Sequence, residues 1–103
     1  MKKHKLVINA NALKDIQEIT DWYNSQLKGL GSRFQKQTKS QINKLRDNPY
    51  SYSIRYSSVR CMLVKKFPFL VHFVIDELDA TIEVFAIIHT GRNPEVWEQK
   101  KAQ

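Results

Sequence analysis

Apolar residues are spaced differently in the two halves of the chain. Over residues 12–48 they recur every three or four positions, a spacing typical of amphipathic helices. Over residues 59–89 they gather in short runs rich in Val, Ile and Phe, which are typical of strands. A further strand is predicted over residues 5–9, where Leu6 and Ile8 share one face. The pattern therefore predicts one strand, then helices, then a sheet.

The helical part divides at Gly29-Leu30-Gly31, a segment that interrupts the helical spacing. The first helix is predicted over residues 12–28, with Asn9 and Asn11 as candidate N-caps. Its side toward the core is expected to be a single apolar stripe, made of Leu13, Ile16, Ile19, Tyr23 and Leu27.

The second helix is predicted to start at Ser32, because Ser32 and Gln35 have the spacing of a capping box. It ends before Pro49, which disfavours helical backbone at the preceding residue. Its weaker inner stripe is Phe34, Thr38, Gln41 or Ile42, and Leu45. Two amphipathic helices joined by so short a turn are expected to form an antiparallel hairpin.

Three strands are predicted over residues 59–66, 69–76 and 80–89. The segment Glu77-Leu78-Asp79 separates the last two, which suggests an antiparallel pair. Regular alternation in the last strand assigns one face to the core, namely Ile82, Val84, Ala86 and Ile88. The opposite face is mixed and is a candidate working surface, made of Thr81, Glu83, Phe85, Ile87 and His89.

This order of elements predicts a single α+β domain over residues 1–103. An N-terminal strand precedes a two-helix antiparallel hairpin that packs on one face of an antiparallel sheet, and a short polar C-terminal tail follows over residues 90–103. The tail is a candidate for a short helix after Pro94. A hydrophobic content of 42% fits one modest core.

Cysteine content and hydropathy bear on where the protein works. Cys61 is the one cysteine, so the chain has no internal disulfide, and this favours a reducing cytoplasm. The apolar runs have the length of strands, so no membrane span is expected. No cofactor motif and no cluster of metal ligands is present, so neither a cofactor nor a metal is expected.

The net charge is +7, and the excess is uneven along the chain. Residues 1–48 hold ten basic and four acidic side chains, whereas residues 49–103 hold seven and six. Such an excess suggests an acidic partner, either nucleic acid or an acidic protein, and solubility is the alternative explanation. On the second helix Arg33, Lys36 and Lys44 share one stripe, which is either solvated or a docking surface.

Several segments, taken in order, resemble the RelE/ParE superfamily of toxins. The first helix ends in Asp21-Trp22-Tyr23, which resembles the tryptophan/tyrosine segment of that family. The matching segments are Leu30-Gly31-Ser32-Arg33-Phe34, Asn48-Pro49, Val59-Arg60, Phe67-Pro68-Phe69-Leu70-Val71 and Ile87-Ile88-His89-Thr90-Gly91-Arg92-Asn93-Pro94, with Trp97 in the tail. The resemblance covers nearly the whole chain.

The resemblance implies the toxin of a type II toxin–antitoxin pair, neutralised by a cognate acidic antitoxin. It implies one of two targets, DNA gyrase or mRNA on the ribosome. Cleavage of mRNA requires a general base, a general acid and cations that hold the phosphate. The candidate catalytic residues for that reaction are Arg60, His89 and Arg92, which are expected to converge on one exposed patch.

Two departures from the mRNA-cleaving branch favour gyrase as the target. Phe69 stands where that branch has an arginine, and no tyrosine follows residue 56, so Trp97 occupies the tail instead. Each candidate also has a structural interpretation: His89 as a hydrogen-bonded strand end, Arg92 as a surface ion pair with Glu95, and Arg60 as a paired buried cation.

The sequence thus predicts a cytoplasmic toxin that inhibits DNA gyrase as ParE does, without catalysis. The first alternative is an enzyme, a RelE-like, ribosome-dependent and metal-independent mRNA endonuclease. The second alternative is a basic nucleic-acid-binding module or an inactive homologue. Candidate residues for binding the antitoxin or the target are Arg33, Lys36, Lys44 and Trp97.

Overall fold

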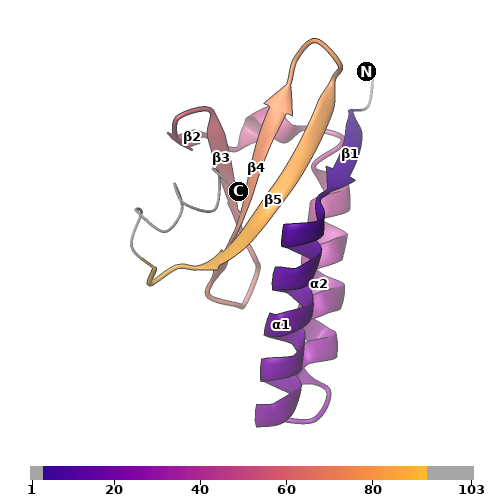
Figure 1. Ribbon diagram of the computed structural model, residues 1–103, viewed down its shortest axis with the longest axis vertical. Helices are drawn as coiled ribbons and strands as arrows, with labels where there is room; N and C mark the ends of the chain where they lie inside the picture. The colour runs from indigo at the N-terminus through magenta and orange to yellow at the C-terminus, as the bar shows by residue number, and fades with distance from the viewer. Residues whose placement is uncertain (1–3, 93–103) are drawn as a thin grey trace.

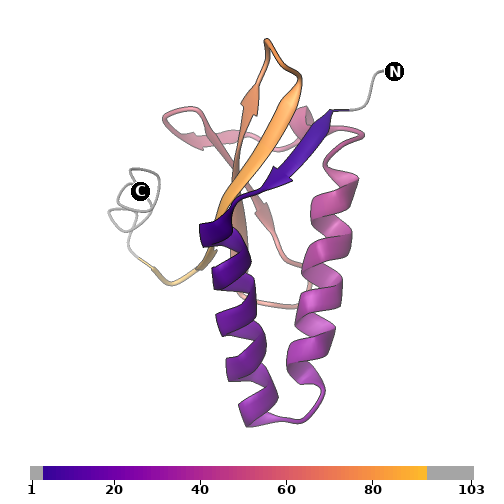
Figure 2. The ribbon, with the colours of Figure 1, turned by 45° about the vertical axis from the view of Figure 1, so that its right-hand side comes forward.

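A computed structural model describes residues 4–92 as two helices packed on one side of a five-stranded sheet (Figures 1 and 2). In chain order the elements are β1 (Lys5–Ile8), α1 (Ala10–Gln26), α2 (Leu30–Lys44), the short 3-10 helix η1 (Pro49–Ser51), β2 (Ile54–Tyr56), β3 (Val59–Leu63), β4 (Phe69–Asp76) and β5 (Thr81–His89). None of the helices in the described part of the chain is long and apolar enough to cross a membrane.

The predicted α+β class is confirmed, but the sheet is mixed rather than wholly antiparallel. Its strand order is β1-β5-β4-β3-β2, and β1 runs parallel to β5 while the other neighbours are antiparallel. Both helices and three strands separate β1 from β5 in the chain, so no tight turn forces these two strands to be antiparallel. Strand β2 was not predicted, because three residues are too few to show a periodicity.

Helix α1 begins at Ala10, two residues before the predicted start, and it is rotated relative to the predicted stripe. The Asn9 side chain accepts a hydrogen bond from the Ala12 N–H at 2.9 Å, which confirms Asn9 as the N-cap. Ile16 is buried as expected, whereas Leu13 and Leu27 are 47% and 61% exposed. The stripe prediction was wrong for these two because Leu13 lies at the rim of the buried side and Leu27 follows the last helical turn.

Helix α2 begins at Leu30, two residues before the predicted Ser32, so the capping-box prediction was wrong. Gly29 precedes the helix with φ +89°, a left-handed conformation that glycine adopts without strain. The cap comes instead from α1, because the Asn24 side chain accepts the Gly31 N–H at 2.7 Å. A side chain at Gly31 would overlap the Thr20 carbonyl, so the two helices touch there backbone to backbone. The predicted antiparallel hairpin is confirmed (Figure 2).

A β-bulge at Phe85 divides β5 and shifts its faces. His72 pairs with Ala86 and Phe73 with Val84, which leaves Phe85 without a partner in the register. Ile82, Val84 and Ile87 therefore pack in the core beneath the helices. Phe85, Ala86 and Ile88 pack on the opposite face with Val59, Cys61 and Leu70. The predicted faces hold as far as Phe85 and were wrong for the residues after it, because each residue after a bulge points to the other side of the sheet.

Candidate functional site

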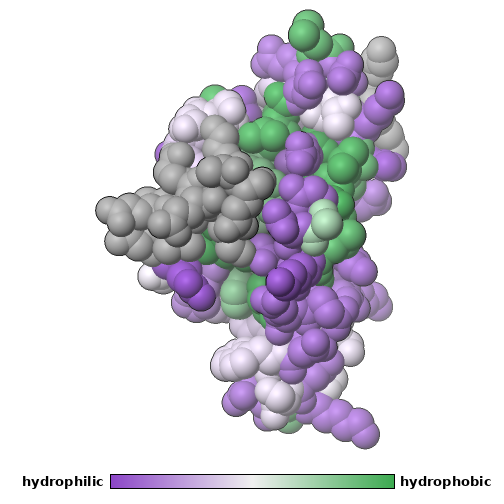
Figure 3. Space-filling view, in the orientation of Figure 1, coloured by the Kyte–Doolittle hydropathy of each residue, from purple (hydrophilic) through white to green (hydrophobic). Residues whose placement is uncertain are grey.

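A pocket of about 150 Å³ opens between α1 and the carboxyl end of β5. Its apolar wall comes from both layers of the fold, and its polar groups are two carboxylates, an imidazole and a guanidinium. The lining residues are Asp15, Glu18, Ile19, Phe69, Ile87, Ile88, His89 and Arg92. On the face that Figure 3 shows, hydrophilic side chains cover the outer side of α1. The pocket joins two of the three predicted catalytic residues, His89 and Arg92.

Asp15 fixes α1 against the edge of β5. Strand β1 pairs with β5 only as far as Val84, so beyond that point the edge of β5 has no neighbouring strand on that side. The Asp15 carboxylate accepts the Ile87 N–H at 3.0 Å and so takes the place of a strand carbonyl. Asp15 is only 9% exposed, which makes it a structural part of the pocket wall.

His89 is held in one orientation by its neighbours. Its ring meets the Phe69 ring edge-on, with the ring centres 5.2 Å apart. Its Nδ1 accepts the Gly91 N–H at 2.9 Å, which places the proton of the neutral imidazole on Nε2. The Arg92 N–H is bonded to the His89 carbonyl at 3.0 Å. His89 therefore offers one N–H donor, and the sequence prediction of a hydrogen-bonded strand end describes this geometry.

Aromatic rings brace the pocket from within the core. The centre of the Phe69 ring lies 6.1 Å from that of Tyr23 and 5.5 Å from that of Phe34. The centre of the Phe67 ring lies 5.3 Å from the centres of the same two rings. Burial raises the pKa of the Tyr23 hydroxyl above its ordinary value. Edge-on contacts of this kind add to the stability that area burial provides. The position of His89 thus depends on the packing of both helices.

Arg60 lies apart from His89 and Arg92, so the predicted convergence of three residues is not found. Arg60 pairs with Phe73 of β4, whereas His89 pairs with Phe69, four residues or about 13 Å along the strand. The Arg60 guanidinium donates to the Tyr52 carbonyl at 2.6 Å and stacks 5.2 Å from the centre of the Tyr50 ring. These contacts tie η1 to β3 and fit the paired, structural interpretation of Arg60.

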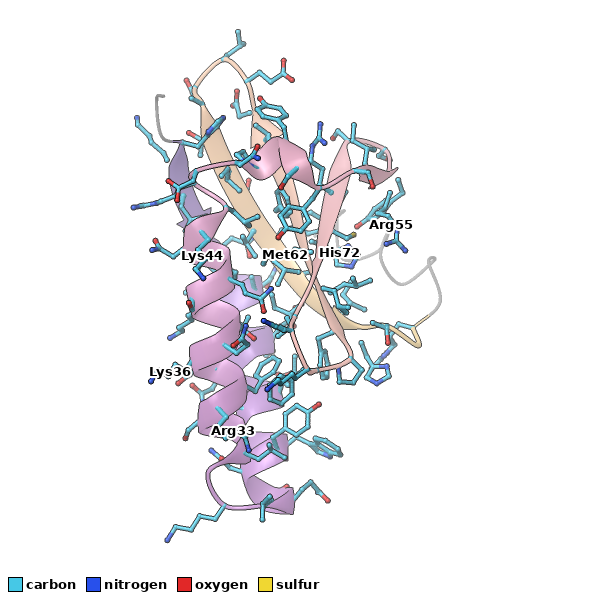
Figure 4. All side chains as sticks on the ribbon, turned by 180° about the vertical axis from the view of Figure 1, so that it is seen from behind. Arg33, Lys36, Lys44, Arg55, Met62 and His72 are labelled. Atoms are coloured by element: carbon cyan, nitrogen blue, oxygen red, sulfur yellow. The ribbon has the colours of Figure 1, made fainter. Side chains whose placement is uncertain are left out.

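The three predicted binding residues of α2 do share one face. Arg33, Lys36 and Lys44 are exposed and follow one side of α2 in Figure 4. Arg33 and Lys36 also line a shallow hollow with Gln37 and Ser40. Trp97 lies outside the described residues.

The comparisons with known proteins decide the family. A family model described as the ParE toxin of the type II toxin–antitoxin system parDE matches residues 6–94. This chain belongs to the ParE toxin family. The comparison with curated protein sequences gave no match.

Solved structures of related toxins share the fold of this ParE-family toxin. A structure of a chromosomal ParDE system from P. aeruginosa is 16% identical and has a TM-score of 0.75, covering 84% of this chain and 96% of that one. A free mutant RelE toxin from E. coli is 14% identical with a TM-score of 0.70, covering 97% and 96%. The RelBE toxin–antitoxin complex from E. coli is 14% identical with a TM-score of 0.65, covering 86% and 99%.

On the sheet face away from the helices, the toxin buries a hydrogen-bonded group of polar side chains. The Tyr56 hydroxyl lies 3.0 Å from His72 Nδ1, and the Cys61 sulfur lies 3.5 Å from the same atom. Burial raises the pKa of the Cys61 thiol to about 11, although the charge of Arg55 opposes the shift. Cys61 is therefore a neutral thiol at physiological pH.

Sequence reasoning missed Asp15 and Glu18 as parts of the pocket. Asp15 did carry a signal, because it lies next to Ile16 and four positions before Ile19 on the buried side of α1. A carboxylate in that position needs a buried partner. Glu18 is exposed and carried none. Among residues 4–92 no group of three or more His, Cys, Asp or Glu side chains is placed to hold a metal ion.

Proposed function

We propose that this ParE-family toxin arrests growth by binding and inhibiting DNA gyrase, and that a cognate acidic antitoxin neutralises it. The observation that carries the choice of gyrase is the separation of Arg60 from His89 and Arg92. Cleavage of RNA needs its cations and its acid–base groups around one phosphate. Inhibition by a protein–protein contact requires no such assembly.

The charges of the pocket support the same choice. Arg92 shares the pocket with the carboxylates of Asp15 and Glu18, so two acidic groups face one guanidinium. Two carboxylates oppose the binding of a phosphodiester, whose transition state gains negative charge. Arg60 is engaged by Tyr52 and Tyr50 and does not add a second cation there.

The overall charge supports an acidic antitoxin as partner. The net charge of +7 favours association with an acidic protein, and two of the solved structures that share this fold are toxin–antitoxin assemblies. We assign the exposed face with Arg33, Lys36 and Lys44 to the surface that meets the target, and Trp97 to the same role in the tail. The antitoxin then acts by covering part of that surface in the cytoplasm.

Induction of the toxin without antitoxin tests the proposal. Growth should stop, and purified toxin should inhibit the supercoiling of plasmid DNA by gyrase. The variants His89→Ala and Arg92→Ala should inhibit gyrase as well as the original chain does. Cleaved mRNA in a translating extract, lost in Arg92→Ala, together with unimpaired supercoiling would instead establish the endonuclease. Normal growth on induction would identify an inactive homologue or a plain binding module.

A further inference from the structure

We propose that the outer face of α2 binds the phosphate backbone of duplex DNA, without regard to sequence. This inference rests on the proposed function, because the enzyme proposed there as the target works on duplex DNA. Within the surface that meets the target, it assigns the outer face of α2 to the DNA on which gyrase works rather than to gyrase itself.

The shape of the face suits a phosphate backbone. Arg33, Lys36, Ser40 and Lys44 are spaced by three or four residues, so they form one stripe. Figure 4 shows Arg33, Lys36 and Lys44 along the helix. From Arg33 to Lys44 the stripe extends about 16 Å along the helix axis. All four side chains are exposed, and the first three also line the shallow hollow on α2. Cations and hydroxyls of this kind are the usual donors to phosphate oxygens.

The charge of α2 is of one sign and is not neutralised within the described fold. The helix holds four basic residues, Arg33, Lys36, Lys39 and Lys44, and no acidic residue. Within residues 4–92 the recorded ion pair joins Lys14 and Glu18, both on α1. The cations of α2 therefore have no carboxylate within 4 Å among these residues. A rigid row of such cations attracts a polyanion strongly at low salt.

The absence of apolar anchors distinguishes DNA from a protein as the occupant. Protein interfaces depend on a few buried aromatic and aliphatic side chains, and these are enriched in Trp and Tyr. The large hydrophobic residues exposed in the helical hairpin are Leu13, Trp22 and Leu27, and all lie in α1 or directly after it. No such side chain is exposed on α2. The face of α2 thus fits a partner that is recognised by charge and hydrogen bonds alone.

Fluorescence anisotropy with a labelled duplex of about 20 base pairs tests the proposal. Three phosphate contacts predict that affinity falls about 40-fold between 50 and 200 mM salt. The double variant Lys36→Gln/Lys44→Gln should bind at least about tenfold more weakly at 50 mM salt and lose about two thirds of the salt dependence. The matched control is Lys14→Gln, which removes an exposed charge from α1 and should leave binding within about twofold.

Several outcomes would overturn the proposal. An equal loss of binding free energy per removed charge in Lys14→Gln and in the α2 variant would show binding by net charge alone. An unchanged salt dependence in the α2 variant would place the contact elsewhere. Tighter binding to single-stranded RNA of equal length than to the duplex would point to RNA. Circular dichroism of each variant confirms that the fold is intact.

Gyrase inhibition by the same variants separates this inference from the proposed function. If the α2 variant loses DNA binding and the original chain inhibits gyrase fully, the proposed function stands. If the original chain inhibits gyrase but does not bind DNA, only the inference is overturned. DNA binding without any inhibition of gyrase overturns the proposed function and leaves the contact as a property of α2.

Discussion

At the scale of single residues, Asp15 shows how one polar side chain positions the pocket. Its carboxylate accepts the N–H of Ile87 where β5 has lost its neighbour β1. The two residues are 72 positions apart, so the bond joins the start of the fold to its end. A buried N–H without an acceptor costs more than an average hydrogen bond contributes.

We therefore expect Asp15→Ala to lower the free energy of unfolding by about 1 to 3 kcal/mol, because the Ile87 N–H loses its acceptor. Asp15→Asn keeps an acceptor oxygen, so it should lower the free energy of unfolding by less than Asp15→Ala does. Chemical denaturation measures both changes. Asp21→Ala, an exposed position on the same helix, is the control and should stay within about 0.5 kcal/mol. Equal effects at positions 15 and 21 would contradict the role given to Asp15.

A second prediction at this scale concerns the thiol of Cys61. Its pKa is raised from 9.0 to about 11 by burial, so unfolding releases a proton in the intervening pH range. The free energy of unfolding should then fall as the pH rises from about 9 to about 11. In Cys61→Ala this fall should be smaller, because the contribution of the thiol is absent. The comparison of denaturation midpoints for the two proteins at pH 8 and pH 10.5 measures it. A pH dependence identical in both proteins would show that the thiol does not contribute.

The residues of the site were predictable where their chemistry is local. His89 and Arg92 were named because they lie in a short segment that resembles the closing motif of the family, and Asn9 because a cap is set by three neighbouring residues. The side-chain contacts of Arg60 are with Tyr52 and Tyr50, and the spacing of residues in the sequence does not predict that this segment folds over β3. Side-chain convergence is a tertiary property, and the sequence pattern constrains it only weakly.

At the scale of elements, the helical hairpin is set by two glycines with different roles. Gly29 supplies the left-handed turn, and no atom lies within 4 Å of the position that a side chain would take. Gly31 lies where α1 and α2 touch, and a side chain there would overlap backbone atoms of Thr20. The sequence showed that the helix is interrupted near these residues but not which glycine makes the turn and which the contact.

We expect Gly31→Ala to destabilise the toxin by about 3 kcal/mol or more, because the helices must move apart to admit the methyl group. Gly29→Ala should lower the free energy of unfolding by about 1 kcal/mol, because alanine is strained in a left-handed conformation although no neighbouring atom obstructs its methyl group. Thermal unfolding of the two variants gives the difference. A larger loss at position 29 than at position 31 would contradict the assignment of the close contact.

The strands show the same limit of sequence patterns. Strand β3 ends at Leu63, three residues before the predicted end. The positions of the last two strands were predicted closely, since β4 coincides with the run over residues 69–76 and β5 spans residues 81–89 of the predicted 80–89. Their faces were not, because the bulge at Phe85 reverses the alternation and brings Ile87 under the helices. A bulge is decided by the pairing of β5 with β4, which the pattern of one strand does not reveal.

At the scale of the whole molecule, the pairing of β1 with β5 joins the ends of the fold. Leu6 and Ile8 pack against the core beneath the helices, while Val7 is 47% exposed on the other face. This pairing brings together residues about 75 positions apart, as in Leu6 with Ile82. Contacts of such separation carry a large entropic cost of loop closure and tend to form late in folding.

We therefore expect Ile8→Ala to lower the stability by about 1 to 2 kcal/mol and to act mainly on the unfolding rate. If β1 docks after the rate-limiting step, the folding rate should change by less than about twofold while unfolding becomes about tenfold faster. Stopped-flow refolding and unfolding in denaturant measure both rates, and Val7→Ala is the matched control, with little effect on either. A folding rate that falls in proportion to the lost stability would place the β1–β5 pairing in the folding nucleus.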